Sequence, residues 1–195
     1  MRKAKVLAKG YVSPYQVVSY YVLAGILAAC HIGLAIYLAP VSISVMIGCL
    51  VLAALCFLIP LLGLAFDRTA MRYSLTDTHV QSRNLFGTCC RLRDTEVKQI
   101  ELQYSFEFWK NSVQKEAVHL VCSDAYYKQV PYISRKYHRK KQVVVRITRK
   151  NFPKVQAYLA RMGVPMAFSS YDALMQMLKP RQLTWREKDG NWSLQ

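Results

Sequence analysis

Fifty-six consecutive residues of this chain, 11–66, carry no Asp, Glu, Lys or Arg. The hydrocarbon core of a bilayer is about 30 Å thick and needs roughly 20 apolar residues of helix. Residues 17–38 and 41–66 each supply such a span. Pro40 falls between them, where proline would interrupt a helix. The sequence therefore predicts a transmembrane helical hairpin over residues 17–66.

Basic residues flank this apolar stretch and indicate its orientation. The connection between the two spans is uncharged, whereas cytoplasmic segments next to membrane helices carry an excess of Lys and Arg. We therefore expect a multi-pass protein of the plasma (inner) membrane with both termini cytoplasmic, in which residues 1–16 form a basic cytoplasmic leader. The flanking basic residues are Arg2, Lys3, Lys5, Lys9, Arg68 and Arg72.

A signal sequence is the main alternative to a membrane-spanning first helix. A basic start followed by an apolar run also opens secretory signal peptides, and Leu-Ala-Ala-Cys at residues 27–30 is similar to a lipoprotein cleavage site. The chain remains apolar after Cys30, however, where a lipoprotein has a polar tether. We favour the transmembrane interpretation.

Small residues recur on one face of the first predicted helix. Gly25, Ala29 and Gly33 are spaced by four, and small residues at this spacing allow close approach of another helix in a membrane. The second helix of the hairpin is the expected partner, and self-association is the second choice. His31 is an ionisable group within the span, but the spans contain no Asp or Glu. We therefore expect it to hydrogen-bond to the facing helix.

Residues 67–163 have a different character. The 23 basic and 11 acidic residues from Asp67 onward give that part a net charge of +12. Apolar and polar residues alternate in short segments there, which predicts β-strands. Asn151 and Pro153 then open an amphipathic helix that Gly163 ends. The predicted strands cover residues 71–75, 79–86, 89–93, 97–106, 117–122, 126–132 and 142–148.

This pattern resembles the bacterial pleckstrin-homology-like (PH-like) domains that follow two membrane spans. Tyr-Ser-Leu-Thr-Asp-Thr-His-Val at residues 73–80 is similar to their opening strand. Residues 86–93 and 94–101 resemble the arginine-bearing strand and the segment after it, and residues 143–161 the last strand and C-terminal helix. The resemblance implies an α+β protein with a mostly antiparallel β domain closed by that helix. It also implies interaction rather than catalysis.

Residues 164–195 extend beyond the usual PH-like pattern. Ser169 and Ser170 can cap a short helix over residues 171–178. Asp189-Gly190 is a strong type I′ turn signal and predicts a hairpin of residues 184–188 and 191–194. The hairpin carries two Trp residues and is expected to dock on the domain, although contact with lipid headgroups or with a partner are alternatives.

The densest charge cluster lies at residues 135–141. Basic side chains beside anionic lipid contribute about 1 kcal/mol each, so the loop is a candidate site for anionic headgroups or for a partner. A solvated loop without a ligand carries equal weight, and nucleic acid is less favoured because no recognition motif accompanies the charge. The basic residues are Arg135, Lys136, Arg139, Lys140 and Lys141.

Signals for catalysis are absent from the sequence. It has no phosphate-binding loop, nucleophile elbow or zinc-ligand spacing, and its six scattered cysteines are typical of a reducing compartment. We expect no catalytic residues, metal or cofactor. The favoured function is a non-enzymatic binding or scaffold module that acts on a protein complex or the inner leaflet, with a protein partner or a homo-oligomer. The alternatives are an accessory subunit of a membrane transporter or secretion-type machine, and a membrane enzyme.

Overall fold

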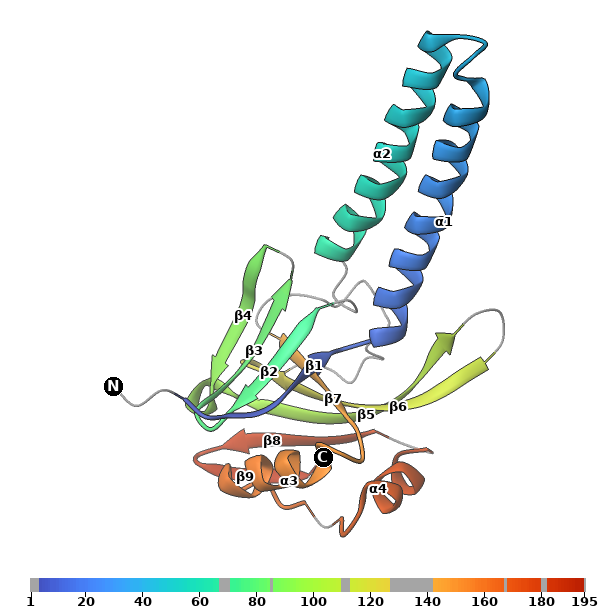
Figure 1. Cartoon of the computed structure of the whole chain (residues 1–195). Coiled ribbons are helices and arrows are strands. Elements are labelled where there is room, and N and C mark those ends of the chain that lie inside the picture. The colour runs from blue at the N-terminus through green and yellow to red at the C-terminus, as the bar shows by residue number, and fades with distance from the viewer. Residues whose placement is uncertain are drawn as a thin grey trace.

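A computed structural model shows a helical hairpin that projects from one end of a β-rich domain (Figure 1). The protein is α+β, with antiparallel pairing throughout its two sheets. The structure describes residues 4–66, 71–84, 86–109, 113–126, 142–166, 168–179 and 182–194.

The hairpin consists of α1 (Pro14–Leu38) and α2 (Ile43–Phe66). Pro14 opens α1 at a first-turn position, where the missing N–H of proline costs nothing. Among the described residues, the Val17–Leu38 part of α1 is long and apolar enough to cross a membrane, and Ile43–Leu58 of α2 is apolar over a shorter length. The helices begin three residues before and two residues after the predicted starts.

The two helices pack through a different face of α1 from the one predicted. Ala24, Ala28 and Ala35 are buried on α1, opposite Cys49 and Ala53 of α2. The predicted partner of the other small-residue face was α2, and that expectation is wrong. Its members are exposed, and a Cβ at either glycine would meet no atom within 4 Å: Gly25, Ala29 and Gly33.

Sheet 1 contains four strands in the order β1-β2-β3-β4. Its first strand, β1, lies in the predicted basic leader, residues 1–16. Strand β1 pairs with β2, which follows the helical hairpin in the sequence, so the whole hairpin separates the two paired strands along the chain. Ala8 and Gly10 face inward, and Lys9 faces out. This alternation is short, and the neighbouring basic residues make it hard to recognise as a strand in the sequence. The strands are β1 (Val6–Tyr11), β2 (Arg72–Thr76), β3 (His79–Asn84) and β4 (Gly87–Arg93).

Sheet 2 contains five strands in the order β7-β6-β5-β8-β9, joined to sheet 1 by the short helix η2 (Asp94–Glu96). The predicted strands are present with shifted ends, and β5 and β6 form a longer hairpin than expected. The predicted strand over residues 126–132 lies almost entirely outside the described residues. The strands are β5 (Gln99–Trp109), β6 (Val113–Ser123), β7 (Gln142–Ile147), β8 (Leu183–Lys188) and β9 (Asn191–Leu194).

Helices α3 (Phe152–Arg161) and α4 (Tyr171–Leu178) complete one core with both sheets. Ser170 caps α4 as predicted, because its Oγ accepts a 3.2 Å hydrogen bond from Ala173 N. Asn151 makes no such cap on α3. Its amide instead donates to Tyr73 Oη (3.1 Å) and Arg146 O (2.9 Å), which ties the start of α3 to both sheets.

The predicted C-terminal hairpin docks on the domain, which confirms one of the expectations for it. Asp189 (φ 53°) and Gly190 (φ 85°) have the positive φ values of a type I′ turn. Strand β8 pairs with β5, and Trp185 is buried in the common core. Residues 164–195 are therefore part of the β domain.

Candidate functional site

The helical hairpin is inserted between two paired strands of the β domain. Strand β1 ends two residues before α1 begins, and the Val12 N–H donates to Met71 O (3.0 Å), next to β2. His119 Nε2 of β6 lies 3.3 Å from Val12 O, and the Arg146 guanidinium lies 5.4 Å from the centroid of the Tyr15 ring. Residues of both sheets therefore contact the junction between the helical hairpin and the domain.

A row of buried polar side chains lies on the face of sheet 2 opposite the main core. Gln99, Glu101 and Gln103 alternate along β5 and are each at most 5% exposed. Burial raises the pKa of the Glu101 carboxyl, and hydrogen bonds donated by the two glutamine amides oppose part of that rise. The amides thus hold the carboxyl in place. In the described part of the chain, no group of three His, Cys, Asp or Glu side chains is close enough to hold a metal ion.

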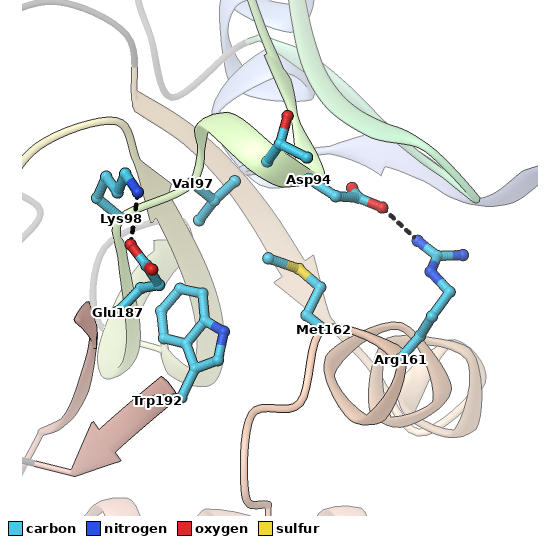
Figure 2. A pocket seen from close by; sticks show the side chains of 8 residues that line it. Asp94, Val97, Lys98, Arg161, Met162, Glu187 and Trp192 are labelled. Atoms are coloured by element: carbon cyan, nitrogen blue, oxygen red, sulfur yellow. Dashed lines mark hydrogen bonds and ion pairs between the residues drawn. The ribbon is translucent and has the colours of Figure 1, made fainter. Parts of the chain in front are cut away.

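An open groove of about 330 Å³ lies where η2, α3, β8 and β9 meet. Of these elements, α3, β8 and β9 are seen on the side of the domain away from the helical hairpin (Figure 1). The apolar lining comes from Val97, Met162 and Trp192. Figure 2 shows Met162 and Trp192 between two ion pairs. We call this site the Trp192 groove; its lining residues are Asp94, Thr95, Val97, Lys98, Arg161, Met162, Glu187 and Trp192.

The two ion pairs fix the polar walls of the Trp192 groove. Arg161 Nη2 lies 2.8 Å from Asp94 Oδ2, and Lys98 Nζ lies 2.5 Å from Glu187 Oε2. The hydrogen bond between the second pair raises the pKa of Lys98 and lowers that of Glu187, so both are charged at neutral pH. The charges of the walls balance, and the groove therefore suits an uncharged ligand with apolar groups.

Tyr158 supports the Asp94 wall from beneath. Its hydroxyl donates a 3.1 Å hydrogen bond to Asp94 Oδ1, and the Arg161 guanidinium lies 5.2 Å from the centroid of its ring. Burial raises the pKa of Tyr158 far above its ordinary value, so the hydroxyl keeps its proton and acts as a donor at any physiological pH. Asp94 is thereby held by two donors.

Among the described strands, β9 forms the free edge of sheet 2, beside the Trp192 groove. In a two-residue hairpin the pair that flanks the turn, here Lys188 and Asn191, exchanges hydrogen bonds, and bonded and non-bonded pairs then alternate. Glu187 accordingly turns its N–H away from β9 and donates to Lys98 O (2.9 Å). By the same alternation Trp192 and Leu194 direct their backbone N–H and C=O groups toward the free edge.

The predicted site residues do not meet in this groove. The basic cluster formed by Arg135, Lys136, Arg139, Lys140 and Lys141 lies outside the described residues. The small-residue face of α1 lies in the helical hairpin. The sequence singled out Trp192 as part of a docking hairpin, but its ion-paired neighbours come from three segments: residues 94–98, the end of α3 and the β8–β9 hairpin itself. These segments are far apart in the sequence, so only the fold brings them together.

No protein-family model, no curated protein and no solved structure matches this chain.

Proposed function

We propose that the chain is a non-enzymatic, membrane-anchored binding module. Helices α1 and α2 both span the plasma membrane, both termini are cytoplasmic, and the β domain stands at the inner face. There it binds a protein partner through the Trp192 groove and the free edge of β9. The observation that carries this proposal is the insertion of the hairpin between paired strands, with the groove on the far side of the domain from the helices.

Length and exposure support the membrane-spanning part of the proposal. At about 1.5 Å per residue, helices of 25 and 24 residues are long enough for a hydrocarbon core about 30 Å thick. Large apolar side chains are exposed along both helices, and only lipid or another membrane protein would shield them from water. They include Val22, Leu23, Ile26, Ile32, Leu34, Ile36, Ile47, Leu50, Val51, Leu52, Leu55 and Leu58.

The strand order supports a PH-like fold for the β domain. Strands β1 to β4 form one antiparallel sheet, β5 to β7 begin the second, and α3 follows β7 directly. The mostly antiparallel strands and the closing helix after β7 agree with what the sequence resemblance implies. The resemblance took residues 73–80 as the opening strand, whereas β1 precedes the helical hairpin and these residues belong to β2 and β3. In this interpretation α4, β8 and β9 are an extension of the domain, and the helical hairpin is inserted after its first strand.

The proposed ligand of the Trp192 groove is an extended, uncharged segment of a partner protein. An exposed sheet edge pairs with such a segment through main-chain hydrogen bonds, and pockets for alternate side chains supply the specificity. A side chain of the added strand would enter the groove between Met162 and Trp192. Natural proteins usually protect such edges with charged residues or proline. The edge strand β9 instead carries an exposed apolar residue, Leu194, which is 56% exposed.

Cysteine labelling tests the topology. Val41, 77% exposed in the turn between α1 and α2, is replaced by Cys. An impermeant maleimide applied to intact cells is expected to label Val41→Cys but not the wild type. Exposed Cys89 in β4 is a built-in control that should react only after the membrane is permeabilised. Labelling of the wild type in intact cells, or no labelling of Val41→Cys, would contradict the proposed orientation.

Proline substitution tests the protein-binding function. Leu194→Pro removes a backbone N–H that faces the free edge and leaves the β8–β9 hydrogen bonds intact. The full-length protein is extracted in mild detergent, and co-purifying proteins are quantified by mass spectrometry. Trp192→Ala and Leu194→Pro should each reduce recovery of the partner by about tenfold or more, the loss expected for a central contact.

Two control variants distinguish a specific loss of partner binding from a loss of non-specific hydrophobic binding. Leu194→Ala keeps the backbone N–H and should retain most of the partner. Phe86→Ala removes a side chain that is 69% exposed in the distant β3–β4 turn and should retain all of it. If all four variants recover the partner equally well, the partner does not bind at the groove. That outcome would contradict the proposal.

An accessory subunit of a membrane transporter or secretion-type machine is the second candidate function. The observation that favours it is the exposed small-residue face of α1, which α2 leaves uncovered. Gly25→Leu and Gly33→Leu would block close helix approach there. Loss of an integral membrane partner from these variants alone, with no effect of Leu194→Pro, would favour this second function.

A further inference from the structure

The outer face of sheet 1 carries an exposed basic side chain from every strand. Strands β1 and β2 contribute one each, β3 contributes one, and β4 contributes two. None of them belongs to the basic cluster that the sequence singled out. We call this surface the basic face; its members are Lys9, Arg72, Arg83, Arg91 and Arg93.

The strand register places these side chains in three successive rows. Arg72 lies opposite Arg83 in the row nearest the helical hairpin. Lys9, Ser74, Gln81 and Arg91 form the next row, and Arg93 lies opposite His79 in the third. Rows two residues apart are separated by about 7 Å, and neighbouring strands by about 4.8 Å. The basic groups thus cover the face in both directions.

None of these five side chains forms an ion pair with an acid among the described residues, where the ion pairs use other bases. The acids at the strand ends have other partners: Asp77 accepts the Lys5 backbone N–H, Asp94 binds Arg161, and Glu96 Oε2 accepts the Arg93 backbone N–H (2.9 Å). Arg72 and Arg83, directly opposite on one face, have the arrangement of like charges that destabilises a sheet. A cost of this kind is expected where a surface is shaped for a ligand.

Neighbouring groups support the arginines without neutralising them. Arg72 Nε donates a 2.7 Å hydrogen bond to Tyr11 Oη, and Arg91 Nη2 lies 3.4 Å from His79 Nδ1. Burial, followed by the charge of Arg91, lowers the pKa of His79, so its imidazole is neutral at pH 7 and adds no charge beside Arg91. The guanidinium groups are oriented and keep their full charge.

We propose that the basic face binds an acidic segment of a partner protein, at a site separate from the Trp192 groove. Guanidinium groups bind carboxylates through two parallel hydrogen bonds, and four of the five members are arginines. The rows extend over about 14 Å, which matches a segment with acidic residues at several positions. Charge complementarity, rather than apolar contact, carries the recognition.

The direction of the strands argues against the membrane surface as the ligand. Strand β3 runs toward the base of α2 and β4 runs away from it (Figure 1). Of the three rows, that of Arg72 and Arg83 therefore lies nearest the helices, and Arg91 and Arg93 follow one and two rows farther away. The attraction of anionic headgroups falls off within a Debye length of about 8 Å in physiological salt. Arg91 and Arg93 would be left without a ligand. This step rests on the proposed membrane anchoring, and the binding test below does not.

Nucleic acid fits the surface less well than an acidic polypeptide. Sheet surfaces that bind single strands stack the bases on aromatic side chains. Tyr11 is the aromatic side chain on the described outer face of sheet 1, and the Arg72 guanidinium lies 4.9 Å from the centroid of its ring. It therefore has no open ring face on that side. Duplex DNA is retained as an outcome of the test.

The test measures binding of defined polyanions to the full-length protein in phosphatidylcholine nanodiscs. The probe is a fluorescein-labelled peptide of alternating Glu and Ser, and a labelled DNA duplex and vesicles with phosphatidylglycerol are compared with it. Replacing Arg83, Arg91 and Arg93 together by Glu should weaken peptide binding by about tenfold or more. A control with the same charge change replaces three exposed lysines elsewhere and should lose less than about threefold: Lys150, Lys154 and Lys188.

Three results would overturn the proposal. Equal losses in both triple variants would show that net charge alone attracts the peptide, and tighter binding of DNA or vesicles would assign the face to phosphate groups. Where the Glu triple variant does not fold, Arg83→Gln, Arg91→Gln and Arg93→Gln replace it, since removing like charges should not lower the melting temperature. Unchanged peptide binding by this folded variant also overturns the proposal.

Discussion

Ala8→Glu should lower the free energy of unfolding of the β domain by about 3–5 kcal/mol, the loss expected when an unpaired charge is buried. Ala8 is 7% exposed, lies opposite Leu75 and belongs to the main core. A carboxylate there would enter the space between the two sheets. Urea titration of the full-length protein in detergent micelles, followed by far-UV circular dichroism, measures the loss.

The neighbouring residue supplies the control for Ala8→Glu. Lys9 lies on the same strand with its side chain exposed on the opposite face, so Lys9→Glu should change stability by about 0.5 kcal/mol or less. Both variants introduce a glutamate side chain, at two adjacent positions of the same strand. If residues 6–11 were only a tail, the two would unfold at the same urea concentration, and the pairing of β1 with β2 would be refuted.

The sequence predicted elements with strong local signals more closely than those that depend on distant partners. Helix α4 was placed at its observed bounds, because a Ser cap begins it and Pro180 follows it closely. The turn at Asp189-Gly190 also has its predicted type. Strand β1 was missed, because its pairing partner in β2 lies beyond the whole helical hairpin and six residues offer little periodicity.

The prediction of which face of α1 packs against α2 was wrong for a related reason. The spacing of Gly25, Ala29 and Gly33 identifies a face suited to close packing, but it cannot say which partner takes that face. Ala24, Ala28 and Ala35 form a second small-residue face one position away, and α2 packs there. A single sequence contains both faces, and only the direction in which the turn returns α2 decides between them.

The candidate sites show the same limit. Alternating arginines in β4 were visible, but the basic face also needs Lys9, Arg72 and Arg83 from three other strands. From the sequence alone, the densest basic run, residues 135–141, was therefore interpreted as the candidate binding site. The Trp192 groove combines η2, α3, β8 and β9 in the same way. In both sites the chemistry depends on sheet register, which local composition does not specify.

Trp185 should be the most costly of the C-terminal side chains to remove. It is 2% exposed, and its Cα partners are Ile100 on β5 and Leu194 on β9. Trp185→Ala opens a large cavity in the core and should lower the free energy of unfolding by about 3–5 kcal/mol. The same urea titration, monitored by circular dichroism so that loss of the fluorophore does not matter, measures this change.

Trp185→Phe should lose much less stability than Trp185→Ala, for two reasons. The ring keeps most of the apolar contacts, and the indole Nε1 of Trp185 has no hydrogen-bond partner among the described residues, so its removal deletes a buried unsatisfied donor. Trp192→Ala, at a half-buried position in the groove, should also cost less than Trp185→Ala. If Trp185→Ala instead unfolds at the wild-type urea concentration, strands β8 and β9 do not share the core of the domain, and the Trp192 groove loses one of its walls.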